Sequence, residues 1–267
     1  MITTLRYSAT NTYLITGSKG KLLFDTGWAG TLPAFFHCLG ENGIKAQDIS
    51  MLVISHFHPD HMGIAQQIAD LCVTLEAADV QRDFLHASDS IFAKDKRLDF
   101  VPIDDSNVRF FTTDQSRSML AELGISGEII HTPGHSDDSI SLWLDDEKAL
   151  FVGDLNPLYE LDAHKGTPIA QSWEKLLALQ PKTVYYAHAK TAQLGETSAR
   201  SPELAGTDIY ALVKKIIKLT DKGCTAELIC KKTGADIGFV SDVRRMYVTH
   251  PNVDVQGILD RIEIKGK

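Results

Sequence analysis

Apolar residues along the chain occur in short runs, and polar or glycine-rich segments separate them. Residues 1–26 predict three short strands; the clearest two, at residues 12–15 and 22–25, are joined by a turn at residues 17–20. Residues 32–42 then predict a helix, which a glycine ends. The next apolar run, residues 51–55, predicts another strand. The first part of the chain therefore alternates strands with a helix.

The second part of the chain shows the same alternation of strands and helices. Four apolar runs predict strands, at residues 128–131, 140–144, 149–152 and 183–186. A helix is expected at residues 173–179, between the last two of these strands. Because strands and helices alternate in both parts, we expect an α/β fold in which helices cover sheets.

Residues 79–105 are the least regular part of this predicted main body, because they mix large apolar side chains with many charges. One interpretation is a helical insertion that covers a cleft. The other is a helix of the outer layer. The sequence alone leaves both interpretations open.

A polar linker follows residue 195 and precedes a C-terminal helical segment. Helices are predicted at residues 209–219, 225–233 and 237–248, with Gly234 between the last two. This pattern is typical of a helix-turn-helix-like packing unit. We therefore predict a main domain over residues 1–200 and a small helical appendage over residues 207–267.

Composition limits the class of protein and its expected compartment. The chain has 267 residues, 43% hydrophobic and 23% charged, which is typical of a water-soluble globular protein. Its apolar runs are too short to span a bilayer, and its first residues lack the features of a signal peptide, so the cytoplasm is the expected compartment. The four cysteines are dispersed and predict thiols instead of disulfides.

The net charge of −8 is unevenly distributed. Residues 214–267 hold 11 of the 27 basic and 7 of the 35 acidic residues, which gives +4 there and −12 in the preceding part. An acidic main body is a poor electrostatic match for nucleic acid. Arg244 and Arg245 lie in the last predicted helix, but Asp236 and Asp242 accompany them, so we favour an interaction or capping role for the appendage over DNA binding.

The strongest chemical signal is the stretch His56-Phe57-His58-Pro59-Asp60-His61, which follows a predicted strand. Imidazole and carboxylate groups are ligands of zinc, iron and manganese. Four such groups packed this closely would repel one another if the imidazoles were protonated, and a bound cation relieves that repulsion. The spacing therefore predicts a metal site in the loop.

Three further candidate ligands stand where predicted strands end. His135 follows a Thr-Pro-Gly turn, Asp154 follows an apolar strand and Gly153, and His188 follows the last predicted strand. The glycine permits a close approach of the backbone. Loops at strand ends can converge on one rim of layered sheets. Together with the first stretch they provide seven ligands, enough for two metals.

In this order these residues resemble the metallo-β-lactamase-fold superfamily, over about residues 10 to 190. Asp25-Thr26-Gly27 and Thr132-Pro133-Gly134-His135-Ser136 are similar to two further landmarks of that superfamily. The resemblance implies a four-layer αββα sandwich with a dinuclear metal site at one edge of its two sheets. The helical appendage would follow this sandwich in the chain.

The resemblance also implies a role for each ligand. His56, His58 and His135 would hold one metal, and a second metal would be held by the set Asp60, His61 and His188. Asp154 would bridge the two metals. Asp25 would lie behind the ligands and orient one of them. His131 and His164 are expected to lie outside this metal centre.

Departures from the family pattern narrow the expected activity. Asp154 argues against β-lactam hydrolysis, because true β-lactamases lack an aspartate there, whereas the glyoxalase II and lactonase branches carry it. His58 stands where flavodiiron proteins usually have glutamate. Ala189 replaces the glycine that usually follows the last ligand histidine.

The expected enzyme is a metal-dependent hydrolase of a small ester, thioester or lactone. A hydroxide bridging two divalent ions, zinc by default and iron or manganese otherwise, would attack the carbonyl. Asp60 would orient this nucleophile or carry a proton to the leaving group. Tyr159 is a candidate donor to the oxyanion, although a packed loop tyrosine is the plainer interpretation.

Two alternative reactions use the same centre: phosphodiester hydrolysis, and an iron-dependent oxidation of persulfide dioxygenase type. A regulator that acts through its C-terminal helices is a further, non-enzymatic alternative. The expected partner is a small molecule, with neither nucleic acid nor membrane favoured. A homodimer formed through the C-terminal helices is compatible with the sequence.

Overall fold

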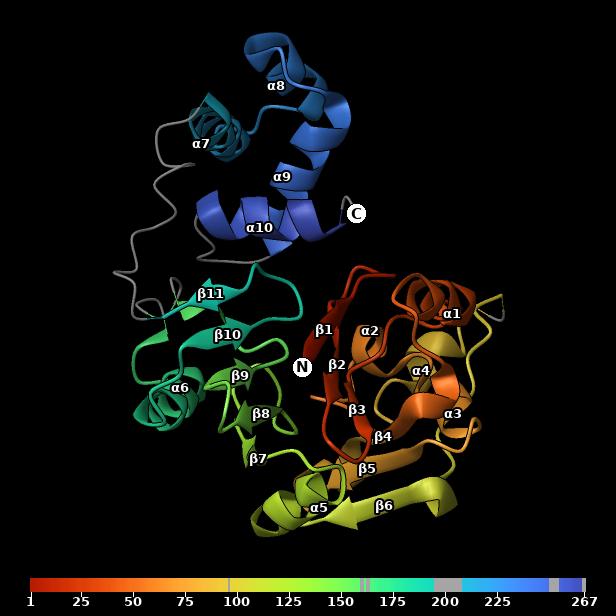
Figure 1. Ribbon diagram of the computed structural model, residues 1–267. Coiled ribbons are helices and arrows are strands. Elements are labelled where there is room, and N and C mark those ends of the chain that lie inside the picture. Colours follow the sequence, from red (N-terminus) through yellow and green to blue (C-terminus); the bar gives the residue numbers. More distant parts are fainter. Residues whose placement is uncertain (96, 159–160, 162–163, 195–207, 250–254, 266–267) are drawn as a thin grey trace.

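Two sheets packed face to face form the centre of the computed structural model, and helices cover both outer faces (Figure 1). The structure describes residues 1–267 except 96, 159–160, 162–163, 195–207, 250–254 and 266–267. The predicted polar linker thus lies outside the described residues. Among the described residues, no helix is both long enough and apolar enough to cross a membrane.

The first sheet has six strands in the order β1-β2-β3-β4-β5-β6. Its strands are β1 (Ile2–Leu5), β2 (Thr12–Thr16), β3 (Lys21–Phe24), β4 (Ile49–Val53), β5 (Thr74–Ala78) and β6 (Val108–Phe111). The first three strands pair antiparallel, and the pairs from β3 to β6 are parallel. Parallel neighbours end at the same edge of a sheet, so the segments that follow β3 and β4 are brought side by side.

The second sheet has five strands in the order β11-β10-β9-β8-β7. Its strands are β7 (Gly127–His131), β8 (Ile140–Leu144), β9 (Ala149–Phe151), β10 (Thr183–Tyr185) and β11 (Ala192–Gln193). One pair, β9 and β10, is parallel, and the other three pairs are antiparallel. The segments after β9 and β10 therefore also leave the sheet at a common edge.

Strands β2, β3 and β4 of the first sheet are largely buried on both faces, which explains why they appear in the sequence as continuous apolar runs. Successive side chains point to opposite faces. Leu14 and Leu23 pack in the cluster beneath the outer helices, whereas their neighbours Ile15 and Leu22 pack between the sheets. The layer between the sheets is completed by residues of the second sheet, Ile129, Leu142, Leu144 and Phe151.

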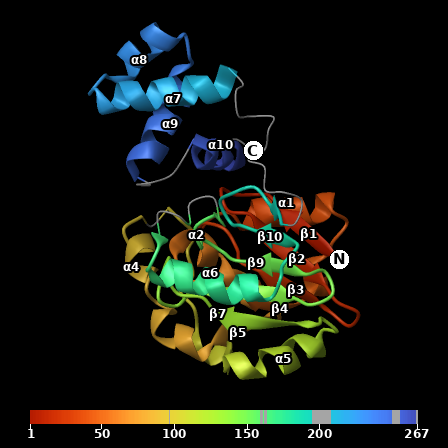
Figure 2. The ribbon, with the colours of Figure 1, turned by 90° about the vertical axis from the view of Figure 1, so that its left-hand side faces the viewer.

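Helices form the two outer layers of the sandwich. The first sheet is covered by α1 (Leu32–Glu41), α2 (Pro59–Met62), α3 (Ala65–Ala69) and α4 (Asp89–Phe92), and α5 (Ser116–Glu122) follows β6. The second sheet is covered by α6 (Pro168–Ala178), whose fully buried Trp173 packs against Leu150 and Val184. Figure 2 shows α6 in front of the second sheet. The predicted four-layer αββα sandwich is confirmed.

Four C-terminal helices, α7 (Asp208–Asp221), α8 (Ala226–Thr233), α9 (Ile237–Thr249) and α10 (Val255–Lys265), lie beyond one end of the sandwich (Figures 1 and 2). They share an apolar cluster of their own that includes Val213, Ile229, Val240 and Ile258. Gly234 ends α8 with a positive φ of 74°, a conformation that glycine adopts readily. The domain boundaries at 200 and 207 remain a prediction.

Residues 79–105 take the second of the two arrangements considered for them. Leu85, Phe92 and Ile103 are buried in the cluster that also contains residues of α1 and α3. Phe92 stacks on Phe100 with ring centroids 4.2 Å apart. The described part of this segment thus belongs to the outer layer of the sandwich.

Gly63, directly after α2, allows this short helix to lie against the loop that follows β3. A Cβ at Gly63 would lie 2.3 Å from the amide nitrogen of Ala29 and 2.7 Å from the carbonyl oxygen of Gly27. Gly63 has ordinary helical angles, φ −60° and ψ −21°, so a larger residue would be excluded by contact and not by backbone strain. The position of α2 therefore depends on this close approach of two backbones.

We predict that Gly63→Ala lowers the free energy of unfolding by about 1–3 kcal/mol, because the backbone around it must shift. The matched control is Gly40→Ala in α1, where an added Cβ meets nothing within 4 Å. That change should raise the free energy of unfolding by about 0.5–1 kcal/mol. Urea unfolding of both variants tests this, and equal effects would contradict the packing described for α2.

Candidate metal centre

Asp25 lies at the end of β3 and contacts two residues of the strand-end segment that follows β4. Its carboxylate accepts hydrogen bonds from the amide nitrogen of Ser55 at 2.6 Å and from Ser55 Oγ at 2.9 Å. It also lies 3.0 Å from Nδ1 of His61. Asp25 is 1% exposed and has a φ of +66°, a left-handed conformation that aspartate tolerates better than most residues. The parallel pairing of β3 and β4 thus places a buried carboxylate behind His61.

The histidine-rich stretch extends from the loop after β4 into α2. His56 lies in the loop and His58 occupies the N-cap of α2. Asp60 and His61 lie in the helix itself, where the sequence predicted a loop. A proline at the first helical position favours this start, because its fixed φ suits a helix and its missing N–H is not needed there. The one-turn helix turns the two ligands toward the same centre.

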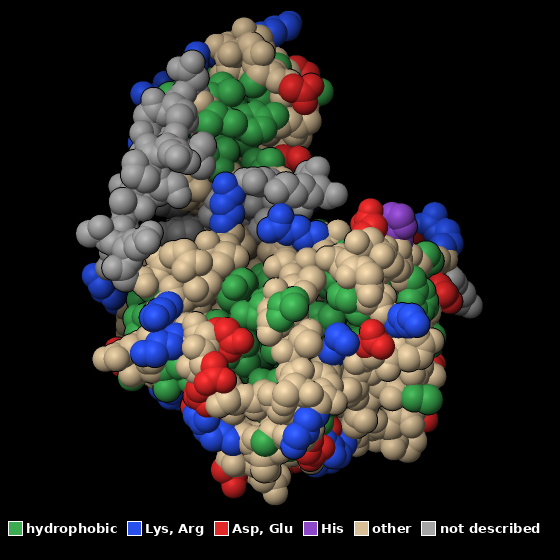
Figure 3. Space-filling view, viewed as in Figure 1, with side chains coloured by type: hydrophobic (Ala, Val, Ile, Leu, Met, Phe, Trp, Pro, Cys, Tyr) green, Lys and Arg blue, Asp and Glu red, His purple; other side chains and the backbone are tan. Residues whose placement is uncertain are grey.

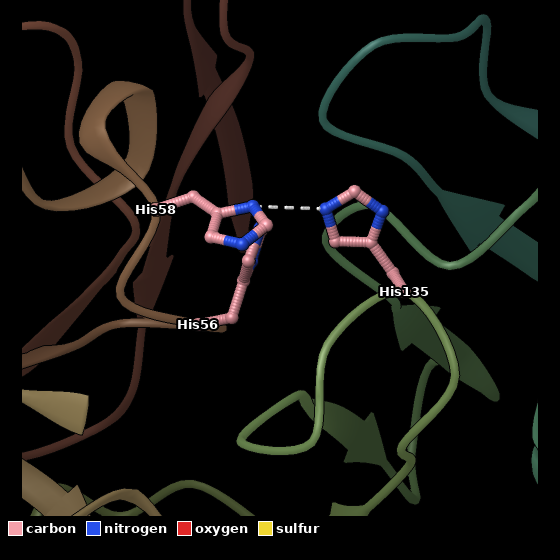
Figure 4. A group of neighbouring side chains, drawn as sticks. All are labelled: His56, His58 and His135. Atoms are coloured by element: carbon pink, nitrogen blue, oxygen red, sulfur yellow. Dashed lines mark hydrogen bonds between the residues drawn. The ribbon is translucent and has the colours of Figure 1, made fainter. Parts of the chain in front are cut away.

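His135 comes from the second sheet and faces His56 and His58, as Figure 4 shows. Nε2 of His135 lies 3.0 Å from Nδ1 of His58. The ring centroids of His56 and His58 are 4.4 Å apart, and those of His56 and His135 are 4.7 Å apart. The three rings thus offer nitrogen atoms to one point between the sheets.

Asp154 and His188 follow β9 and β10, the parallel pair of the second sheet. Oδ1 of Asp154 lies 3.3 Å from Nε2 of His61 and 3.3 Å from Nε2 of His188. Its Oδ2 lies 3.6 Å from Nε2 of His135. Nε2 of His188 is 2.9 Å from Oδ2 of Asp60. Asp154 is therefore flanked by members of both predicted ligand sets.

The structure brings all seven predicted ligands together at one edge of the two sheets. Ligand atoms within 4.8 Å of one another form three groups: His56, His58 and His135; Asp60, His61 and His188; and His56, His61 and Asp154. The first two groups coincide with the two sets that the family resemblance implied. The third group joins them through the aspartate.

Three buried polar atoms indicate that this donor set fits metal ions. Nε2 of His56, Nε2 of His61 and Oδ1 of Asp154 are buried, and none of them makes a hydrogen bond of regular geometry among the described residues, although the last two lie 3.3 Å apart as an ion pair. A buried polar atom without a partner costs free energy, and such atoms call for an explanation such as a bound ion. Imidazole nitrogens and carboxylate oxygens without thiolate suit zinc, iron or manganese.

The protonation of the centre suits a cation in part. Burial lowers the pKa of His61 and of His188, but Asp154 and other carboxylates raise both pKa values above the ordinary one, so these two rings would lose a proton when a metal binds. Burial and the neighbouring His61 lower the pKa of His56 well below its ordinary value, so its ring is neutral, the form that binds metals. Burial alone would raise the pKa of Asp154, but His188 and His61 lower it well below its ordinary value. Likewise, burial opposes ionisation of Asp60, yet the hydrogen bond from His188 lowers its pKa to about 2. Both carboxylates are therefore anionic at neutral pH.

Several supporting residues had no recognisable signal in the sequence. Oδ2 of the buried Asp138 accepts a 2.7 Å hydrogen bond from the amide of Phe57, within the ligand stretch. Thr10 Oγ1 donates to the carbonyl of Asp60 at 2.8 Å. Nδ1 of His188 lies 3.1 Å from the carbonyl of Ala9, which leaves its Nε2 for the centre. These contacts connect residues far apart in the chain, so spacing could not reveal them.

Gly153 provides the close approach that its position before Asp154 predicted. It has a φ of +53°, and a Cβ there would lie 2.6 Å from Oγ of Ser55. Ser55 Oγ in turn lies 3.1 Å from Nδ1 of His56. Glycine therefore lets the second sheet meet the first directly behind the ligands.

A pocket of about 380 Å³ opens beside the centre. Its walls include Asp60, His135, Asp154 and His188 on the metal side, and Ala9, Leu155, Asn156, Pro157, Tyr186 and Ala189 around them. Arg245 and Met246 of α9 complete the lining. Tyr159, the proposed oxyanion donor, lies outside the described residues.

A family model described as the metallo-beta-lactamase superfamily matches residues 5–188. This range covers more than half of the chain and contains strands β2 to β10 and all seven predicted ligands. The chain therefore belongs to the metallo-beta-lactamase superfamily.

Curated relatives of the chain carry two kinds of name. A beta-lactamase-like protein 2 homolog of Caenorhabditis elegans is 32% identical over 146 residues, which are 54% of this chain and 43% of that protein. An atrochrysone carboxyl ACP thioesterase of Emericella nidulans is 30% identical over 150 residues, 54% of this chain and 39% of that protein. The chain thus spans less than half the length of these relatives.

Solved structures show the same fold. A metallo-beta-lactamase family protein from Thermus thermophilus matches with a TM-score of 0.58 and 18% identity, over 99% of this chain and 94% of that one. The BLEG-1 B3 metallo-beta-lactamase matches with a TM-score of 0.57 and 21% identity, over 77% of this chain and 100% of that one. At these identities the likeness concerns the fold alone.

We predict that Asp25→Asn weakens metal binding by about 10- to 100-fold, because the charge that holds His61 and Ser55 is lost. Asparagine keeps the shape of the side chain and also tolerates the left-handed backbone. Zinc affinity, measured by competition with a chelator, tests this. Asp104→Asn, which changes a carboxylate at the start of a surface turn, is the control and should bind zinc as the wild type does. Equal affinities of both variants would show that Asp25 does not orient a ligand.

Proposed function

We propose that the chain is a metal-dependent hydrolase of small esters, thioesters or lactones, with thioesters as the first class to test. The observation that carries this proposal is the position of Asp154 between two complete ligand sets. Such an arrangement suits two ions at once. The atrochrysone carboxyl ACP thioesterases among the relatives support the thioester class.

In this proposal His56, His58 and His135 would hold one ion, the set Asp60, His61 and His188 would hold a second, and the Asp154 carboxylate would serve both. When bound, two divalent ions supply an activated water at neutral pH and a Lewis acid for the carbonyl. Zinc is the first choice of ion, and iron or manganese would suit the same donors.

Asp60 has the clearest role among the side chains of the chain itself. Its carboxylate lines the pocket, remains a third exposed and is ionised at neutral pH. The hydrogen bond from His188 fixes the position of one oxygen. We infer that this carboxylate orients the attacking water and then carries a proton to the leaving group.

Tyr159 completes the proposed machinery as a donor to the oxyanion, five residues after Asp154 in the chain. Removing one such donor typically lowers kcat by about 100- to 1000-fold. Tyr159→Phe should lower kcat more than it raises KM if the hydroxyl acts in the transition state.

The proposed partner is a small molecule, since the pocket has about 380 Å³ and the chain up to residue 213 carries a net charge of −12. Neither nucleic acid nor a membrane fits that acidic surface as well. We retain two further proposals, a homodimer formed through the C-terminal helices and a cytoplasmic location. Size-exclusion chromatography with light scattering tests the first, and cell fractionation tests the second.

We predict that protein purified with its native metal hydrolyses members of an ester, thioester and lactone panel. It should show little activity on bis-p-nitrophenyl phosphate, because a phosphodiesterase for nucleic acid needs a basic groove. Oxygen uptake with glutathione persulfide, in protein loaded with iron, tests the oxidative alternative. Two bound metals without turnover of any ester, thioester or lactone would count against the proposal.

We predict that Asp154→Ala lowers kcat/KM by about 100-fold or more and lowers the metal content below two ions per chain, because a contact shared by both ligand sets is lost. The matched control is His131→Ala. His131 lies at the end of β7 and contacts the carbonyl of Asp137 at 2.8 Å, and it belongs to none of the three ligand groups. Elemental analysis and steady-state kinetics on the same samples test this. Activity that survived in Asp154→Ala would refute the bridging role.

A further inference from the structure

We propose that Arg245 of α9 determines substrate specificity by binding an anionic group, a carboxylate or a phosphate, on the substrate. The inference rests on the proposed function for the reacting end of the substrate. It adds a second point of recognition, supplied by the C-terminal helices. Its basis is the lining of the pocket, which includes both proposed metal ligands and residues of α9.

α9 is held in place by its apolar face. Val240 and Val243 are fully buried in the cluster that α7, α8 and α10 share. Arg245, two residues after Val243, leaves the helix on another side, and with Met246 it lines the pocket. A packed helix thus presents a cation to the cavity, a more defined arrangement than a cation on a free loop.

The guanidinium group retains donors for a ligand. Among the described residues, Asp242 contacts it, with Nη2 of Arg245 3.4 Å from Oδ1 of Asp242. The side chain of Arg245 is 49% exposed and that of Asp242 is half-buried at 32%, and ion pairs so accessible to water contribute little. Arginine has five N–H donors in a planar fork that matches carboxylate and phosphate oxygens. The pair with Asp242 therefore occupies only a small part of this capacity.

The other charged groups of the pocket belong to the metal centre. Asp60, Asp154, His135 and His188 are proposed ligands, and the remaining described lining residues apart from Arg245 are uncharged. Arg245 is thus the one cationic side chain among the described lining residues outside the proposed metal ligands. An anion that enters the pocket would find favourable partners at two places, the metal ions and this arginine.

The uneven charge of the chain makes Arg245 a selective binding position for an anionic group. The part before residue 214 carries −12 and repels anions, whereas residues 214–267 carry +4. Figure 3 shows Lys and Arg side chains at the junction of the C-terminal helices and the sandwich, and others spread over the sandwich. The expected substrate is therefore a small acyl compound with one anionic group, whose carbonyl lies at the metal centre. A polyanion would need more cations than this pocket supplies.

The test compares an anionic substrate with its neutral isostere in the metal-loaded protein. S-acetyl mercaptopropionate and S-acetyl mercaptopropionamide differ only in charge, and acetylthioethyl phosphate replaces the carboxylate with a phosphate. The variants are Arg245→Gln and, as matched control, Lys231→Gln, which removes an exposed cation from α8 of the same helical unit. Binding of the S-methyl thioether of mercaptopropionate and of its amide, measured by calorimetry, provides a readout that does not need turnover.

We expect the wild type to favour the carboxylate over the amide by about 10- to 100-fold in binding, the range of a charge-assisted hydrogen bond. Arg245→Gln should abolish most of this preference, Arg245→Lys should keep part of it, and Lys231→Gln should leave it unchanged. The kcat/KM values of the acetyl thioesters should follow the same pattern. Comparison of the carboxylate substrate with acetylthioethyl phosphate shows which anion is preferred.

A carboxylate preference that persists in full in Arg245→Gln would place the anion on the metal ions and overturn the inference, as would equal binding of both thioethers by the wild type. Absence of turnover across the whole ester, thioester and lactone panel, with an Arg245-dependent binding preference, would instead refute the proposed function and support the anion site.

Discussion

The buried carboxylate of Asp25 is the interaction on which the metal centre depends most directly. It joins the end of β3 to Ser55 after β4 and to His61 in α2, at distances of 2.6 to 3.0 Å. A buried charge of this kind is costly unless hydrogen bonds satisfy it, and each of its contacts here belongs to the ligand-bearing segment. The group that stabilises the strand ends therefore also fixes the orientation of a ligand ring.

The two sheets contribute to the centre by the same principle. β3 and β4 in one sheet, and β9 and β10 in the other, are parallel neighbours, so the segments after them meet at a common edge. Gly153 lets these edges approach closely enough for Asp154 to lie 3.3 Å from both His61 and His188. A dinuclear site needs donors on two sides, and a sandwich of two sheets supplies them without a long loop.

The α/β class and the seven candidate ligands could be predicted from local pattern, because apolar runs reveal buried strands and the candidates stand directly after those strands. The four-layer sandwich and the division of the candidates into two sets followed instead from the family resemblance. The elements β5, β6, α5 and α10 lacked such a signal, and the helical position of Asp60 and His61 was missed because one turn is too short for a period to appear. Contacts between residues far apart in the chain leave no recognisable spacing in the sequence. Asp138 supports Phe57 across 81 residues of sequence, and Arg245 reaches the pocket from a helix that begins after all seven ligands. The charge distribution was the one sequence feature that indicated an electrostatic role for the C-terminal helices.

That distribution gives the C-terminal helices a role that follows from electrostatics. An acidic body lowers the local concentration of anions everywhere on its surface. Divalent ions bound at the sheet edge, as proposed, would reverse this effect over a short distance only, because salt screens charges within about 10 Å at moderate ionic strength. The cation on α9, which also lines the pocket, would extend the favourable region beyond the metal centre. Specificity would then reside in the added helices and reactivity in the sandwich, so each could change in evolution without loss of the other.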